Sequence, residues 1–204
     1  MTNVAHEPAA LIDLVTRALV ASSTSPENAA ATARALVAAE IDGQKGHGLS
    51  RVAAYAAQAR SGKVDGYAVP LLRRTRAASI MIDVANGFAY PAFELAVAEL
   101  PNAARETGIA AAGFTRSHHA GALGLVVERI AASGLMALMV TNSPQAMAAW
   151  GGTRGLFGTN PIAFAAPRPG SEPLVIDLAR RRRWGSYRKL RVARPRPPSP
   201  GASW

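Results

Sequence analysis

The chain has 204 residues, 49% of them apolar, which is enough to bury a sizeable core. No apolar run reaches the ~20 residues that a bilayer span needs, so we expect no membrane segment. The absence of cysteine excludes disulfides and thiolate metal sites. Together with a start that lacks a basic and apolar leader, it predicts a cytoplasmic protein.

The formal net charge of +10 comes from one end of the chain. Residues 1–179 hold 14 Lys and Arg against all 13 Asp and Glu, whereas residues 180–204 hold 9 basic residues and no acidic one. The body of the protein is therefore nearly neutral. A nucleic-acid role would depend on this basic tail alone, and we do not expect one.

Helical spacing and capping residues predict three helices in the first third of the chain. The first covers residues 7–21. The second follows the N-cap Ser25 and ends near residue 41. We expect Ser50 to cap a third helix over residues 51–62.

The rest of the chain predicts strands alternating with helices, and so a mixed α/β fold with an N-terminal helical segment. A helix over 91–100 should break near Pro101 and continue weakly to Gly108. A strand, a helix and a strand over 109–142 together predict a β-α-β unit. Further strands are expected over 78–87, 162–167 and 173–179.

The stretch "SHHAGALG", residues 117–124, places two histidines before the expected helix. Gly121 and Gly124 form only G-x-x-G, which excludes the Rossmann fingerprint and leaves two interpretations. The glycines either admit an anion at a helix N-terminus or allow close packing of helix and strand, and we favour packing.

His118 and His119 must point apart if the chain between them is extended. With no cysteine and no H-x-x-x-H pair in the sequence, we expect no metal site. A structural role and a general acid/base role both remain open for these side chains. The N-terminus of a helix would lower the pKa of a nearby imidazole and keep it neutral.

Arg51 and Tyr55 stand four residues apart and so share a helix face. This face is either simply solvated or part of a binding site. The adjacent "KGHG" favours binding, because Lys45 and His47 lie in a loop whose glycines permit a ligand to approach. Arginine binds carboxylates through a bidentate fork, so a small anionic substrate fits this group.

Five segments in order resemble the malate/L-lactate dehydrogenase family of the second type. They are "GHGLSRVAAYAAQARSGKV", "SHHAGALG", "TNSPQAMAAWGG", "LFGTNPIAFAAP" and "PLVIDLA". This family of NAD(P)-dependent reductases includes ureidoglycolate, sulfolactate and cyclic imino-acid enzymes. The resemblance covers residues 8–179 and implies a non-Rossmann dehydrogenase fold.

The resemblance also implies an activity and a site. His119 would be the general acid/base in hydride transfer between NAD or NADP and a small 2-hydroxy, 2-oxo or imino acid. Arg51 would bind the substrate carboxylate, and Tyr55, His47 and Lys45 would line the pocket. Contacts with the cofactor would come from Ser143, Asp177, Leu178 and Ala179. Family members are usually homodimers or larger.

The composition changes abruptly after Ala179, where the resemblance stops. We interpret the Arg/Pro-rich segment 180–204 as disordered and out of frame, and expect a truncated product whose fold is incomplete at the C-terminus. The domains are then 1–75 on the substrate side, 76–179 for the cofactor, and the tail. Two alternatives are a binding module for nucleic acid or anionic surfaces that uses the basic tail, and an inactive partner subunit.

Overall fold

The computed structural model describes residues 6–178 of the chain. Ala179 and the basic tail, on which several predictions were made, lie outside the described residues. The chain divides into two compact units between Leu125 and Val126. Within the described range, no helix combines the length and the hydropathy that crossing a bilayer requires.

The first unit begins with the three helices that the sequence predicts, α1 (Pro8–Val20), α2 (Pro26–Ile41) and α3 (Val52–Arg60). A short 3-10 helix that the sequence analysis did not predict, η1 (Leu49–Arg51), precedes α3. The N-cap prediction for Ser25 is confirmed, because its Oγ accepts a hydrogen bond from the Asn28 amide at 3.2 Å. Pro26 occupies the first turn of α2, where its missing N–H costs nothing.

The prediction that Ser50 caps the third helix is wrong. Ser50 already lies inside η1, and its hydroxyl donates backwards to the carbonyl oxygen of Lys45 at 2.5 Å. Arg51 takes the N-cap position of α3 without a side-chain cap. Because the 3-10 turn η1 leads directly into α3, Ser50 does not cap this helix. Its hydroxyl instead binds the carbonyl group of Lys45 in the preceding loop.

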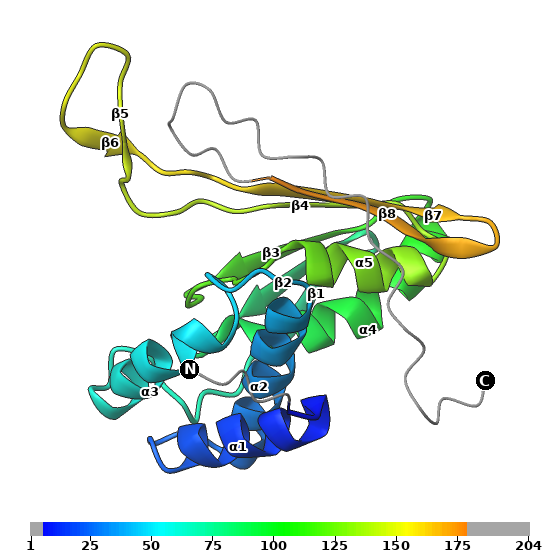
Figure 1. The fold of residues 1–204 in the computed structure, drawn as a ribbon. Helices are drawn as coiled ribbons and strands as arrows, with labels where there is room; N and C mark the ends of the chain where they lie inside the picture. Colours follow the sequence, from blue (N-terminus) through cyan, green and yellow to red (C-terminus); the bar gives the residue numbers. More distant parts are fainter. Residues whose placement is uncertain (1–5, 179–204) are drawn as a thin grey trace. The chain divides into compact units, whose positions relative to one another are not determined.

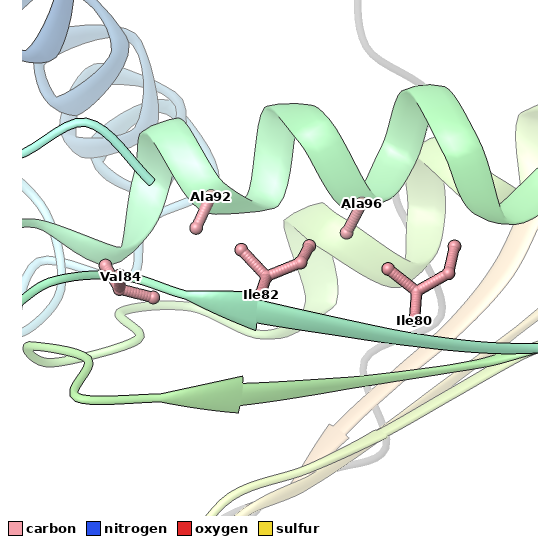
Figure 2. Packing of buried hydrophobic residues seen from close by; sticks show 5 residues of the cluster. All are labelled: Ile80, Ile82, Val84, Ala92 and Ala96. Carbon is pink, nitrogen blue, oxygen red and sulfur yellow. The ribbon is translucent and has the colours of Figure 1, made fainter. Parts of the chain in front are cut away.

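A three-stranded sheet and helix α4 (Ala89–Thr107) complete the first unit. Strands β1 (Leu71–Arg76) and β2 (Ser79–Asp83) pair antiparallel, and β2 pairs parallel with β3 (Ala111–Thr115). Helix α4 lies against the sheet in Figure 1. Figure 2 shows the contact, in which β-branched side chains meet small residues of the helix: Ile80, Ile82, Val84, Ala92 and Ala96. The alanines let the helix approach the sheet closely.

Two predictions around α4 need correction. The helix does not break near Pro101 but runs through it to Thr107. Pro101 is buried and Ala103 beyond it is fully buried, so packing continues past the residue that lacks an N–H. The β-α-β unit over 109–142 is also wrong, because β3 and β4 (Ala137–Val140) belong to different sheets. The parallel unit is instead β2, α4 and β3.

The second unit consists mainly of antiparallel strands. Helix α5 (Gly124–Ala132) spans the boundary, and β4, β7 (Ile162–Arg168) and β8 (Ser171–Leu178) form one sheet in the order β4-β7-β8. Strands β5 (Met147–Ala148) and β6 (Gly155–Phe157) form a separate hairpin (Figure 1). Val140, Ile162 and Leu178 stand opposite one another across the sheet and are all exposed.

Replacing Ser25 with alanine should lower the free energy of unfolding by about 1 kcal/mol, because the Asn28 amide loses its acceptor. Ser50→Ala is the matched control and should change it by less than about 0.5 kcal/mol, because that hydroxyl is exposed. Urea denaturation of both variants measures the difference. Equal losses would contradict the assignment of Ser25 as the cap.

Candidate active site

Three segments of the first unit meet at the hydroxyl of Tyr55. Tyr55 lies in α3, is 2% exposed, and places its hydroxyl 2.7 Å from Nδ1 of His119 in the loop after β3. The same hydroxyl lies 3.2 Å from that of Tyr90, in the first turn of α4. A tyrosine that the sequence analysis assigned to the substrate pocket therefore bonds directly to the expected acid/base.

The loop before α3 brings two more predicted residues to this point. The rings of His47 and His119 stack with centroids 5.4 Å apart and planes 13° apart. The Arg51 Nε donates to the carbonyl oxygen of Gly46 at 2.6 Å, and its Nη atoms make no hydrogen bond or ion pair to any residue in 6–178. Lys45 is exposed, and only its backbone is fixed, by Ser50.

The prediction that His118 and His119 point apart is not confirmed. Their rings make an edge contact with centroids 6.4 Å apart and planes at 76°, and both rings lie against that of Tyr55. His118 packs edge-on against Tyr55 and Phe88, at centroid distances of 4.9 and 5.5 Å. Its Nε2 donates to Oε1 of Gln58 at 2.7 Å, because an amide oxygen can only accept. His118 thus takes the structural role that the sequence left open.

Both histidines are held neutral near physiological pH. Burial, and then the charges of Lys63 and Arg51, lower the pKa of His118 to about 4. The pKa of His119 also falls to about 4, through burial of its ring and then electrostatic interaction with His47, Arg51 and His118. His119 remains exposed as a residue, so its ring is packed on one side and open on the other. Burial and neighbouring cations, rather than a helix terminus, are the causes of the shift.

Gly121 of "SHHAGALG" allows close packing, although not of a helix against a strand as we expected. Gly121 has a φ of +67°, and a Cβ there would overlap the hydroxyl oxygen of Tyr90. The partner is thus a side chain of α4 and not a strand. Among residues 6–178, no three His, Cys, Asp or Glu side chains gather as a metal site would require.

The predicted cofactor residues lie in the second unit. Ser143 ties two loops together, because its Oγ accepts from the Thr159 amide at 2.8 Å and its own amide donates to Oδ1 of Asn160 at 3.1 Å. Asp177 is half-buried in β8, and Leu178 is exposed at the end of that strand. Ala179 lies outside the described residues. An open cavity of about 410 Å³ within residues 145–156 contains none of these side chains.

Two side chains of the site escaped the sequence analysis. Tyr90 and Gln58 carry no motif and stand 35 and 60 residues from their hydrogen-bond partners Tyr55 and His118. One signal was available, since a tyrosine among the apolar residues of a helix brings a hydroxyl that needs a partner when buried. The resemblance supplied Arg51, Tyr55, His47 and His119, which the structure brings together.

Comparison with known proteins agrees with this fold and site. The family model described as Malate/L-lactate dehydrogenase matches residues 7–183. The (2R)-3-sulfolactate dehydrogenase (NADP(+)) of Chromohalobacter salexigens is 48% identical over 166 residues, covering 81% of this chain and 50% of that protein. A Δ1-pyrroline-2-carboxylate/Δ1-piperideine-2-carboxylate reductase of Pseudomonas syringae pv. tomato is 45% identical over 169 residues, covering 83% and 49%.

Solved structures give the same result. The crystal structure of Δ1-piperideine-2-carboxylate reductase from Pseudomonas syringae superposes with a TM-score of 0.77 at 42% identity, covering 87% of this chain and 53% of that one. The malate dehydrogenase of Entamoeba histolytica, at 24% identity and a TM-score of 0.80, shares the fold. The fold is thus one that this chain shares with the dehydrogenases and reductases of these structures. The chain belongs to the malate/L-lactate dehydrogenase family, and it spans about half the length of the curated relatives it matches.

The neutral histidines predict how stability depends on pH. Their pKa values are about 4 in the folded chain against an ordinary 6.5, so the unfolded chain binds more protons between these values. The contribution of these histidines to the free energy of unfolding is therefore complete above pH 6.5, and it is lost as the pH drops toward 4.

His118→Phe keeps a ring against Tyr55 and Phe88 and should make this fall less steep. Urea denaturation from pH 7 to pH 4 measures the slope. His6→Asn, at an exposed histidine before α1, is the control and should retain the wild-type slope. A wild-type slope in His118→Phe would contradict the assignment.

Proposed function

We propose that this chain carries the substrate side of an NAD(P)-dependent oxidoreductase acting on small 2-hydroxy, 2-oxo or cyclic imino acids. The observation that carries the proposal is the 2.7 Å contact between Tyr55 and His119, with His47 stacked on the same imidazole and Arg51 at the start of α3. Both relatives support the substrate class, since their names specify carboxylates, a sulfolactate and cyclic imine 2-carboxylates.

Arg51 binds the substrate carboxylate in this proposal. Its Nε is occupied by the carbonyl oxygen of Gly46, which fixes the direction of the guanidinium, while its two Nη atoms retain their protons for a ligand. Two parallel N–H bonds to a carboxylate give both affinity and orientation. His47 and Lys45, in the loop held by Arg51 and Ser50, line the same pocket.

His119 transfers the proton. In the reducing direction it gives a proton to the substrate oxygen or nitrogen, while carbon 2 receives the hydride; oxidation reverses both transfers. Arg51 and His47 lower the pKa of His119 in the free protein. A carboxylate bound at Arg51 offsets this positive charge, so substrate binding raises the pKa of His119 and favours uptake of the proton that the reduction consumes.

The second unit holds the cofactor in this proposal. Its polar loops over residues 141–143 and 158–161, joined by Ser143, Thr159 and Asn160, offer the hydroxyl, amide and carbonyl groups that suit a dinucleotide. Ser143, Asp177, Leu178 and Ala179 would contact NAD or NADP there. When bound, the nicotinamide supplies or accepts the hydride.

We also propose the arrangement around this function. Residues 1–75 contribute the loop and helix of the substrate pocket, and within 76–179 the part up to Leu125 adds Tyr90 and His119 to that pocket while the part from Val126 serves the cofactor. The protein in this proposal is a cytoplasmic homodimer or larger assembly. The relatives that this chain resembles do not support a basic binding module, and that alternative rests on residues 180–204, outside the described residues.

Arg51→Ala should raise KM for a carboxylate substrate about 10- to 100-fold, because a charge-assisted bidentate contact is lost. Steady-state kinetics with pyrroline-2-carboxylate and with 2-oxo acids measures the change. Arg73→Ala, at an exposed position of β1, is the matched control and should leave KM unaltered. An unchanged KM in Arg51→Ala would show that Arg51 does not bind the substrate and is simply a solvated surface residue.

His119→Ala should reduce kcat by about 10²- to 10⁴-fold, the contribution of a positioned acid/base. Binding of NADPH, followed by its fluorescence, should stay at the wild-type level because His119 lies outside the unit that carries the cofactor residues. An undiminished kcat would remove His119 from the mechanism.

A further inference from the structure

Tyr90 is a buried titratable group that the proposed reaction does not use. It is 7% exposed, and its hydroxyl lies 3.2 Å from that of Tyr55. Within residues 6–178 this is the only hydrogen-bond partner of the Tyr90 hydroxyl. Burial raises its pKa well above the ordinary value of 10.0, so Tyr90 keeps its proton.

The single partner sets the direction of the hydrogen bonds. A buried O–H without an acceptor is costly, so the Tyr90 proton points at the Tyr55 oxygen. Tyr55 has one proton of its own, which it then donates to Nδ1 of His119. A ring nitrogen that accepts carries no proton, and neutral His119 therefore holds its proton on Nε2.

Gly121 lies two residues after His119 and packs against the same hydroxyl. A Cβ at Gly121 would overlap the Tyr90 oxygen and lie 3.2 Å from two carbons of the Tyr90 ring. The loop that carries His119 is thus seated on Tyr90. A side chain at position 121 would push this loop, and His119 with it, away from Tyr55.

We propose that Tyr90 is a positioning residue of the active site, whose hydroxyl seats the His119 loop at Gly121 and makes Tyr55 the donor to Nδ1. The Nε2 proton of neutral His119 then faces outward, since Nε2 has no hydrogen-bond partner within the described residues. This inference rests on the proposed acid/base role of His119, because only there does the choice of nitrogen affect a reaction.

The tautomer can be observed directly in the full chain. In ¹⁵N NMR spectra of the imidazole at pH 7, Nδ1 of His119 should show the shift of an unprotonated nitrogen and Nε2 that of a protonated one. Tyr55→Phe removes the donor and should move the Nδ1 signal. A wild-type protein with its proton on Nδ1 would overturn the proposal.

Glycine variants test the seating of the loop. Gly121→Ala should shift the His119 signals and raise the His119 pKa by about one unit toward 6.5, as the ring leaves its packed position. Gly108→Ala is the matched control, because Gly108 also has a positive φ, +80°, but nothing lies within 4 Å of its would-be Cβ. It should cost stability through backbone strain and leave the His119 signals in place. Equal shifts in both variants would overturn the proposal.

Tyr90→Phe isolates the hydroxyl. In this background Gly121→Ala should lower the melting temperature by less than it does in the wild type, because the overlapping atom is gone. An equal decrease in melting temperature in both backgrounds would show that the His119 loop does not pack on the Tyr90 hydroxyl.

Turnover separates the two proposals. Tyr90→Phe should lower kcat about tenfold with KM unchanged if His119 is the acid/base. NMR results as expected, together with a wild-type chain that shows no turnover, would support the positioning role and refute the proposed function.

Discussion

The paired hydroxyls of Tyr55 and Tyr90 are the constraint on which the site depends. Both rings are buried, with their centroids 6.5 Å apart, so each hydroxyl must find a polar partner inside the protein. The Tyr90 hydroxyl donates its proton to the Tyr55 oxygen, but the Tyr55 proton then still needs an acceptor. His119 accepts that proton, and the need to satisfy it fixes the imidazole against the two helices. The same burial that stabilises the core therefore places the reactive group.

Arg51 is the cation that all members of this cluster share. After burial, which is the largest cause in each case, Arg51 acts on the pKa values of Tyr55, Tyr90, His118 and His119. A ligand carboxylate beside Arg51 would offset this positive charge, so anion binding and the proton affinity of His119 would be coupled.

The sequence predicts an element correctly where local signals, such as helix caps and turn residues, agree with the packing of the whole fold. Ser25 and Pro26 mark the start of α2 because the cap and the first turn need nothing from elsewhere. Pro101 and Ser50 mislead because packing of α4 and the 3-10 turn at η1 override the local preference. β1 escapes prediction because its arginines lack a regular alternation, although cations are common on edge strands.

The same reasoning explains which residues of the site could be predicted from the sequence. Arg51, Tyr55, His47 and His119 lie in motifs that a family resemblance can carry, whereas Tyr90 is joined to them only by the fold, across 35 residues.

The adjacent histidines show how a short segment can hold two roles. His118 bonds Gln58, and His119 bonds the Tyr55 hydroxyl. Both rings also lie against the Tyr55 ring, at centroid distances of 4.9 and 6.3 Å. Tyr55 is thereby held between two consecutive residues of one loop, so a movement of that loop changes the packing and the hydrogen bond together. Gly121 lets the loop pack closely on Tyr90, and in this way it maintains both the packing and the hydrogen bond.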